Sequence, residues 1–198
     1  MSPWDECLAA ASSTQIEVRI PGIQRLASMV RRGLEVLVDA LIAGPDRFLV
    51  AERLVVVGPA IVPVLRPLLR GAQDAETREL AALVMLQLGC HDGVELLVDA
   101  IRQRSEQSFV AIKLLAREGV KSIIPILTDE LLRQVTLLHS CDPPGLEVYV
   151  QALETLGAPI PAPFLEAASS ESAPWELRAR VERFRGPSSR GPGTSSLS

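Results

Sequence analysis

Aromatic, histidine and cysteine residues are scarce in this sequence. Phe, Trp and Tyr make up 4% of the 198 residues, so a hydrophobic core has to be aliphatic, built from Leu, Val, Ile and Ala. Two histidines leave few ways to assemble a nucleophile and its base. Three cysteines without a dense spacing pattern argue against a disulfide framework and favour a reducing compartment.

An excess of positive charge is also missing. The net charge is −4 and the pI is near 5.3, whereas nucleic-acid binders usually carry a basic stripe, so we expect no nucleic-acid partner. Asp5 and Glu6 stand where a secretory leader would be basic. The most apolar run, 54–65, contains glycine and prolines and is too short to cross a bilayer. These features predict a cytoplasmic protein without a membrane partner.

The segment 74–104 has the pattern of two short helices joined by a tight turn. Asp74 is a suitable N-cap, because its carboxylate can accept a free backbone N–H at the positive helix end. Gly89 is suited to end the first helix in a left-handed conformation. The first helix is apolar nearly all round over 80–88, so it needs neighbours on both sides. The second helix has one apolar stripe, formed by Val94, Leu97, Val98 and Ile101.

The helix-pair pattern recurs along the chain. The nine residues beginning at Gly33 align without a gap with those beginning at Gly93, 60 residues later. Independently, the five residues beginning at Ile61 align with those beginning at Ile123, 62 residues later. The shared double spacing indicates a unit of about 30 residues, which is the length of a helix pair.

Glycine and proline set the other expected boundaries. Gly33 is predicted to end one helix, Pro67 to kink another, and Ser105 to cap a third. Trp4 and Trp175, near the two ends, are expected to close the core. Outside the central pair, helices are predicted at 3–11, about 15–32, 34–43, 46–57, 60–70, 105–117, 120–134, 146–156, near 164–168, and at 174–184 as a terminal cap.

A family resemblance rests on the central pair. The residues that carry it are Asp74, Arg78, Ala81, Ala82, Leu86, Leu88, Gly89, Gly93, Val94 and Leu97. Together they resemble the HEAT repeat, particularly the short form in phycobilisome-lyase-type HEAT-like proteins. There an Asp caps the first helix, an Arg follows one turn later, and a Leu-Gly turn leads into the second helix. The resemblance implies a right-handed α-solenoid that binds partners along the face of its second helices.

The expected fold is therefore all-α. It is a right-handed, HEAT/armadillo-like α-solenoid of about five stacked helix pairs with a terminal capping helix. A single domain is predicted over 1–185, followed by a disordered Gly/Pro/Ser tail at 186–198.

The predicted binding surface is the polar face of the second helices, where acidic and basic bands alternate. Its candidate partner-binding residues are Glu35, Asp39, Arg66, Arg70, Glu95, Asp99, Arg102 and Lys121. These charges predict a non-catalytic protein–protein interaction module, an adaptor or scaffold with an unidentified protein partner. A second interpretation is a solvated face with mixed charge. The chain is expected to be a monomer or a weak homo-oligomer, and self-association through an uncapped end is a further possibility.

Catalysis and metal binding are the less favoured alternatives. Cys90-His91 and His139-Ser140-Cys141 hold both histidines, but two repeats separate them and no C-x-x-C spacing is present, so we expect no metal. No catalytic residue and no cofactor is predicted. The repeat type permits one enzymatic alternative, a lyase or lyase subunit acting on a protein-bound cofactor, and a pocket with convergent polar groups at the 136–145 loop would favour it.

Overall fold

The computed structural model describes residues 2–71, 74–135, 145–171, 173 and 178, and every regular element in these ranges is helical. This confirms the all-α prediction. The chain divides into two compact units, Met1–Leu97 (unit 1) and Val98–Ser198 (unit 2). The prediction of a single domain over 1–185 stays a prediction. The terminal cap at 174–184, Trp175 and the tail at 186–198 lie outside the described residues, except for Arg178.

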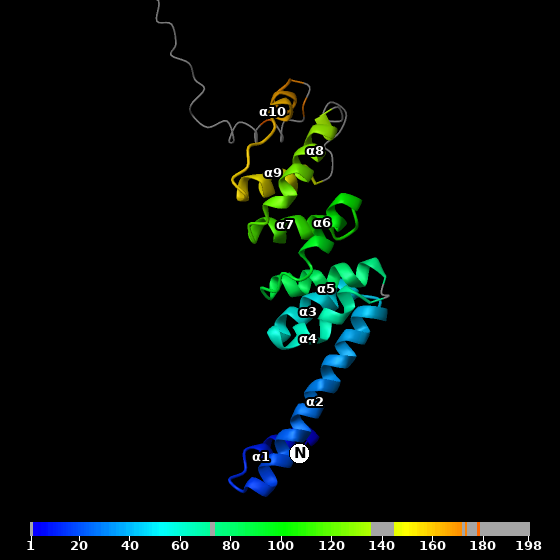
Figure 1. Ribbon diagram of the computed structural model, residues 1–198, viewed down its shortest axis with the longest axis vertical. Helices are drawn as coiled ribbons and strands as arrows, with labels where there is room; N and C mark the ends of the chain where they lie inside the picture. The colour runs from blue at the N-terminus through cyan, green and yellow to red at the C-terminus, as the bar shows by residue number, and fades with distance from the viewer. Residues whose placement is uncertain (1, 72–73, 136–144, 172, 174–177, 179–198) are drawn as a thin grey trace, which may run out of the picture. The chain divides into compact units, whose positions relative to one another are not determined.

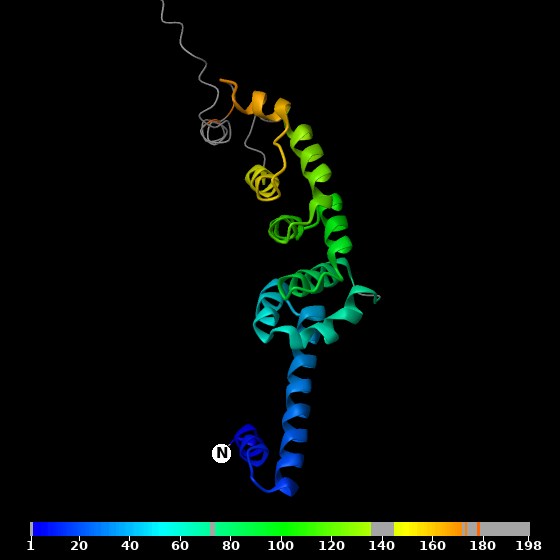
Figure 2. The ribbon, with the colours of Figure 1, turned by 60° about the vertical axis from the view of Figure 1, so that its left-hand side comes forward.

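Unit 1 is built from a helical hairpin followed by a more compact helical layer (Figures 1 and 2). Its elements are α1 (Pro3–Ala11), α2 (Ile16–Ala43), α3 (Arg47–Val57), η1 (Pro59–Ile61), α4 (Val62–Leu65), η2 (Arg66–Leu69) and α5 (Ala75–Gln87). Helix α1 lies alongside the first half of α2, and the rest of α2 packs with α3, α4 and α5. Leu41, Leu54, Ile61, Leu65 and Leu80 are fully buried and form the centre of this layer.

The central helix pair has the predicted local chemistry. Asp74 caps α5 by accepting the Thr77 backbone N–H at 2.9 Å. Gly89 is left-handed with φ +78°, and the Cys90 N–H donates to the Met85 carbonyl at 2.8 Å, which is a Schellman ending. Residues 80–86 are all buried, so α5 has packing partners all round, as expected. Helix α6 (Val94–Gln103) follows and spans the boundary between the units.

Unit 2 repeats the same ending after two of its helices. It contains α7 (Ser108–Arg117), η3 (Lys121–Ile123), α8 (Ile124–Gln134), α9 (Leu146–Thr155) and α10 (Ala162–Ala168). Gly119 and Gly157 are left-handed after α7 and α9, and the residue following each donates its N–H across the turn at 2.9 Å. Helix α9 packs on α7 and α8, α10 packs on α8, and Phe164 of α10 is fully buried.

Two predicted boundaries were wrong or shifted. Helix α2 runs through Gly33 without a break, because a glycine in a helix interior costs only about 1 kcal/mol. Other helices pack on the stretch of α2 before Gly33 and on the stretch after it. Helix α7 begins at Ser108 rather than Ser105, since residues 105–107 form a turn in which the Ser105 carbonyl accepts the Ser108 N–H. Near Pro67, where a kink was predicted, the α-helix ends at Leu65 and the 3-10 helix η2 follows.

The two glycines inside α2 predict opposite effects of the same substitution. Gly33 has open space where a Cβ would stand, so Gly33→Ala is expected to raise the free energy of unfolding by about 0.5–1 kcal/mol. A Cβ at Gly22 would lie 2.6 Å from the Ala10 carbonyl carbon of α1, so Gly22→Ala is expected to push α1 off α2. Urea unfolding and amide hydrogen exchange of α1 measure both. This packing would be contradicted if Gly33→Ala lowered the free energy of unfolding. Unchanged amide exchange of α1 in Gly22→Ala would contradict it as well.

No single helix in the described residues is long and apolar enough to cross a membrane. Arg47–Val57 and Pro59–Leu69, which meet at a sharp bend, reach the required length and composition when taken together.

Candidate functional site

All eight predicted partner-binding residues are exposed. In unit 1, Glu35 and Asp39 lie on α2, Arg66 on η2, Arg70 directly after η2, and Glu95 at the start of α6. In unit 2, Asp99 and Arg102 lie on α6 and Lys121 begins η3. Glu35 and Asp39 were expected on the second helix of a separate pair, and the structure places them instead in the later part of the continuous helix α2.

Three of these charges are already paired within the protein. The Arg66 Nε donates to Asp92 Oδ2 at 2.7 Å, and Arg66 Nη2 lies 4.0 Å from Cys90 Sγ. The hydrogen bond to Asp92 is the main cause that raises the pKa of Arg66, so this guanidinium stays charged. Arg102 donates to Asp99 at 2.7 Å, one turn away on the same helix. Such exposed pairs are screened by water, contribute little to stability and are easily exchanged for a partner's charge.

The other five charges are not paired in this way within the part of their own unit that the structure describes. In the described residues of their own units, no ion pair or side-chain hydrogen bond engages Glu35, Asp39, Arg70, Glu95 or Lys121. Four of them lie in helices and Arg70 follows one directly, so their backbone positions are set by helix geometry rather than by an exposed loop. They are therefore available to an external molecule without breaking an internal contact.

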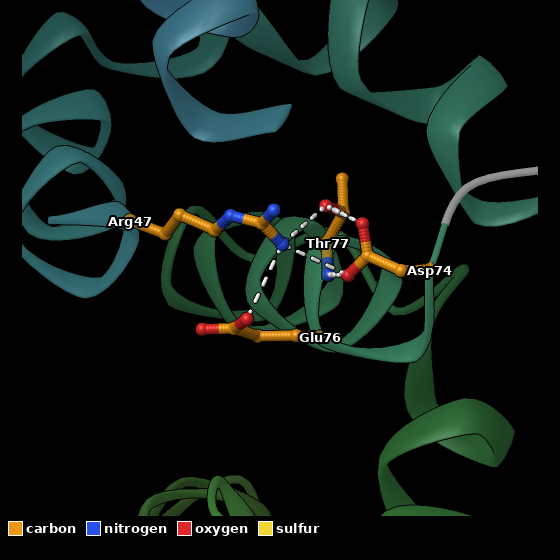
Figure 3. A network of polar contacts seen from close by, with 4 residues as sticks. All are labelled: Arg47, Asp74, Glu76 and Thr77. Atoms are coloured by element: carbon orange, nitrogen blue, oxygen red, sulfur yellow. Dashed lines mark hydrogen bonds and ion pairs between the residues drawn. The ribbon is translucent and has the colours of Figure 1, made fainter. Parts of the chain in front are cut away.

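A polar network in unit 1 was not foreseen from the sequence. Arg47 Nη1 at the start of α3 donates to Asp74 Oδ1 at 3.0 Å and to Glu76 Oε2 at 3.2 Å, and lies 3.4 Å from Thr77 Oγ1 (Figure 3). Thr77 is fully buried and its hydroxyl lies 2.9 Å from Asp74 Oδ2. The Thr77 backbone N–H is the main cause that lowers the pKa of Asp74. The network ties the first turns of α3 and α5 together, a structural role.

A second network in unit 2 surrounds Glu130 of α8. Its carboxylate, 13% exposed, accepts from Arg104 at 2.6 Å and from Gln134 at 2.9 Å, and Arg133 lies at 3.5 Å. Burial raises the pKa of Glu130, but the hydrogen bonds from Gln134 and Arg104 outweigh it and the pKa is lowered. Burial, followed by the nearby Glu130 charge, raises the pKa of Tyr149. A carboxylate held ionised by several donors is a poor proton acceptor, so this network too is better suited to support than to catalysis.

The features on which chemistry would depend lie partly outside the described residues. This part of the chain includes His139, Ser140, Cys141 and residues 136–144 of the loop at which a pocket would favour the lyase alternative. Within the described ranges, no three His, Cys, Asp or Glu side chains are grouped to hold a metal ion.

An exposed apolar surface on α1 and α2 was also missed. Trp4, expected to close the core, is 44% exposed, and Leu8 on the next turn of α1 is 51% exposed. On α2, Ile16, Ile20, Ile23 and Val30 are exposed as well. These residues fall within the helices predicted at 3–11 and about 15–32, but their spacing in the sequence does not show which of them other helices cover.

No family model matches the chain, and neither a curated protein nor a solved structure matches it.

Proposed function

We propose that this chain is a non-catalytic protein-binding module, an adaptor or scaffold, whose helix pairs stack as a right-handed HEAT-like α-solenoid. The repeated helix ending supports this proposal. The left-handed glycines Gly89 and Gly119 end α5 and α7 with the same hydrogen bonds, 30 residues apart, and Gly157 ends α9 likewise. The third ending follows 38 residues after the second, and repeated endings at intervals of about 30–40 residues are typical of helix-pair repeats.

The observation that carries the binding proposal is the set of five exposed charges without a side-chain partner among the described residues of their own units: Glu35, Asp39, Arg70, Glu95 and Lys121. Because helices hold their backbone positions, little further backbone entropy is lost when a partner binds. Acidic and basic residues of this set alternate along the chain, so the partner is expected to present charge of both signs. We propose a protein partner in the cytoplasm rather than a nucleic acid or a membrane.

The test begins with affinity purification of the tagged full chain from its native host, followed by binding measurements with the purified partner. Glu95→Lys reverses an unpaired charge of the proposed surface and is expected to weaken binding about tenfold, since opposite charges become like charges. Glu52→Lys on α3 is the matched control, because Glu52 is exposed but does not belong to the proposed surface. Equal affinities for the two variants, with circular dichroism unchanged, would remove this surface from consideration.

A further inference from the structure

The first half of α2 carries a regular apolar stripe that unit 1 does not cover. Its members are Ile16, Ile20, Ile23, Ala27 and Val30, spaced alternately four and three residues apart. All five are exposed, the four larger ones by 48–58%. Alternate spacing of four and three is the heptad pattern of a coiled-coil seam, which lies along one side of a helix for about 21 Å here.

The stripe continues into the part of α2 that is packed. Leu34, Leu37 and Leu41 extend the same spacing, and exposure falls along it until Leu41 is fully buried. Helix α1 does not cover the free part, because it packs against Gly22, whose position is roughly 100° around the helix from the stripe. The same seam is therefore covered by the chain's own helices at one end of α2 and uncovered at the other.

The geometry points to a second copy of this chain as the occupant: we propose that two α2 helices pair antiparallel along this seam. The arrangement is symmetric about a point near residue 25, which places Ile23 of one copy beside Ala27 of the other and Ile20 beside Val30. The small Ala27 next to the branched Ile23 allows the two helices to approach closely at the centre. A narrow seam two residues wide fits another helix.

Charge complementarity supports this orientation. Glu17, Gln24 and Arg31 are seven residues apart and flank the seam on one side. In the antiparallel pair, Glu17 of each copy lies opposite Arg31 of the other, and Gln24 lies opposite itself. In a parallel pair, the row Glu17, Gln24 and Arg31 of one copy and the same row of the other copy lie on opposite sides of the seam. Glu17 of one copy could then not meet Arg31 of the other.

A membrane surface is the competing occupant, since Arg19, Arg25 and Arg31 would favour anionic lipid. It is less well matched to the molecule. Interfacial helices bury a broad apolar face, whereas this seam is narrow, and the neighbouring first turn of α1 carries Asp5 and Glu6.

The full chain is measured by sedimentation equilibrium at about 1–100 μM, a range suited to a small helical interface. The wild-type chain is expected to dimerise. Ile23→Asp is expected to raise the dimer dissociation constant at least about 30-fold, because it buries two unpaired carboxylates at the centre. Val36→Asp is the control on the same helix, since Val36 is 66% exposed and lies off the seam. Circular dichroism monitors the helix content of both variants.

A charge swap tests the orientation. Glu17→Arg and Arg31→Glu are each expected to weaken the dimer about threefold, and the double variant to recover wild-type affinity. Failure of the double variant to recover overturns the antiparallel register. A wild-type chain that is monomeric throughout, or a dimer equally affected by Ile23→Asp and Val36→Asp, overturns the proposal. So does a monomer that binds anionic phosphatidylserine vesicles through Ile23, which would assign the seam to a membrane.

Discussion

Replacing Gly145 by alanine is expected to destabilise unit 2 by about 1.5–2.5 kcal/mol, because the new methyl group overlaps the Phe109 ring in a backbone conformation that alanine disfavours. Gly145 is the N-cap of α9 with φ +85°, where a Cβ costs about 1 kcal/mol. Phe109 of α7 meets Tyr149 of α9 edge to face with ring centroids 6.0 Å apart. To admit the methyl group the ring must turn, and it then loses a contact worth about 0.5–1.5 kcal/mol.

Gly157→Ala is the matched control for this prediction. Gly157 is also left-handed, at the other end of α9, but nothing lies where its Cβ would stand. Its replacement is therefore expected to cost only the backbone strain, about 1 kcal/mol. Urea unfolding followed by circular dichroism gives both values. Equal costs would show that the Phe109 ring does not restrict this position.

Replacing Asp74 by alanine is expected to destabilise unit 1 by about 1–2 kcal/mol, since α5 loses its N-cap. The buried Thr77 hydroxyl loses its partner at the same time. Arg47→Met removes the ion pairs to Asp74 and Glu76 but leaves the cap intact, so its cost should stay below about 1 kcal/mol. If Arg47→Met proves as costly as Asp74→Ala in urea unfolding, the ion pairs and not the cap stabilise this junction.

The same carboxylate gives a pH dependence with a defined sign. The pKa of Asp74 lies below its ordinary 3.8, chiefly because the Thr77 N–H donates to the ionised form. A carboxyl group with a lower pKa in the folded state stabilises the fold above the unfolded pKa, and this contribution is lost as the pH falls through the folded pKa. Asp74→Asn keeps a capping oxygen but does not titrate. The stability difference between wild type and Asp74→Asn should therefore shrink below about pH 4. A difference that is constant down to pH 2 would contradict a titrating Asp74.

Features with a cause inside one or two helical turns could be predicted from the sequence. The Asp74 cap, the left-handed glycine after α5 and the loss of α-helix at Pro67 depend on a nearby side chain, a missing Cβ or a missing N–H. The helical class follows in the same way, from the spacing of apolar residues. The eight candidate residues could be placed on the surface for this reason, although which of them pair internally could not.

Features that depend on distant contacts were decided by the tertiary structure. Packing by separate helices carries α2 through Gly33, and the approach of α3 to α5 brings Arg47 to Asp74 across 27 residues of chain. Packing also leaves the stripe residues Ile16, Ile20, Ile23, Ala27 and Val30 uncovered, while Leu41, in the same heptad pattern, is fully buried. An apolar stripe has the same sequence pattern whether or not another helix lies on it. The pattern determines which side of the helix is apolar, whereas distant segments of the chain determine what covers that side.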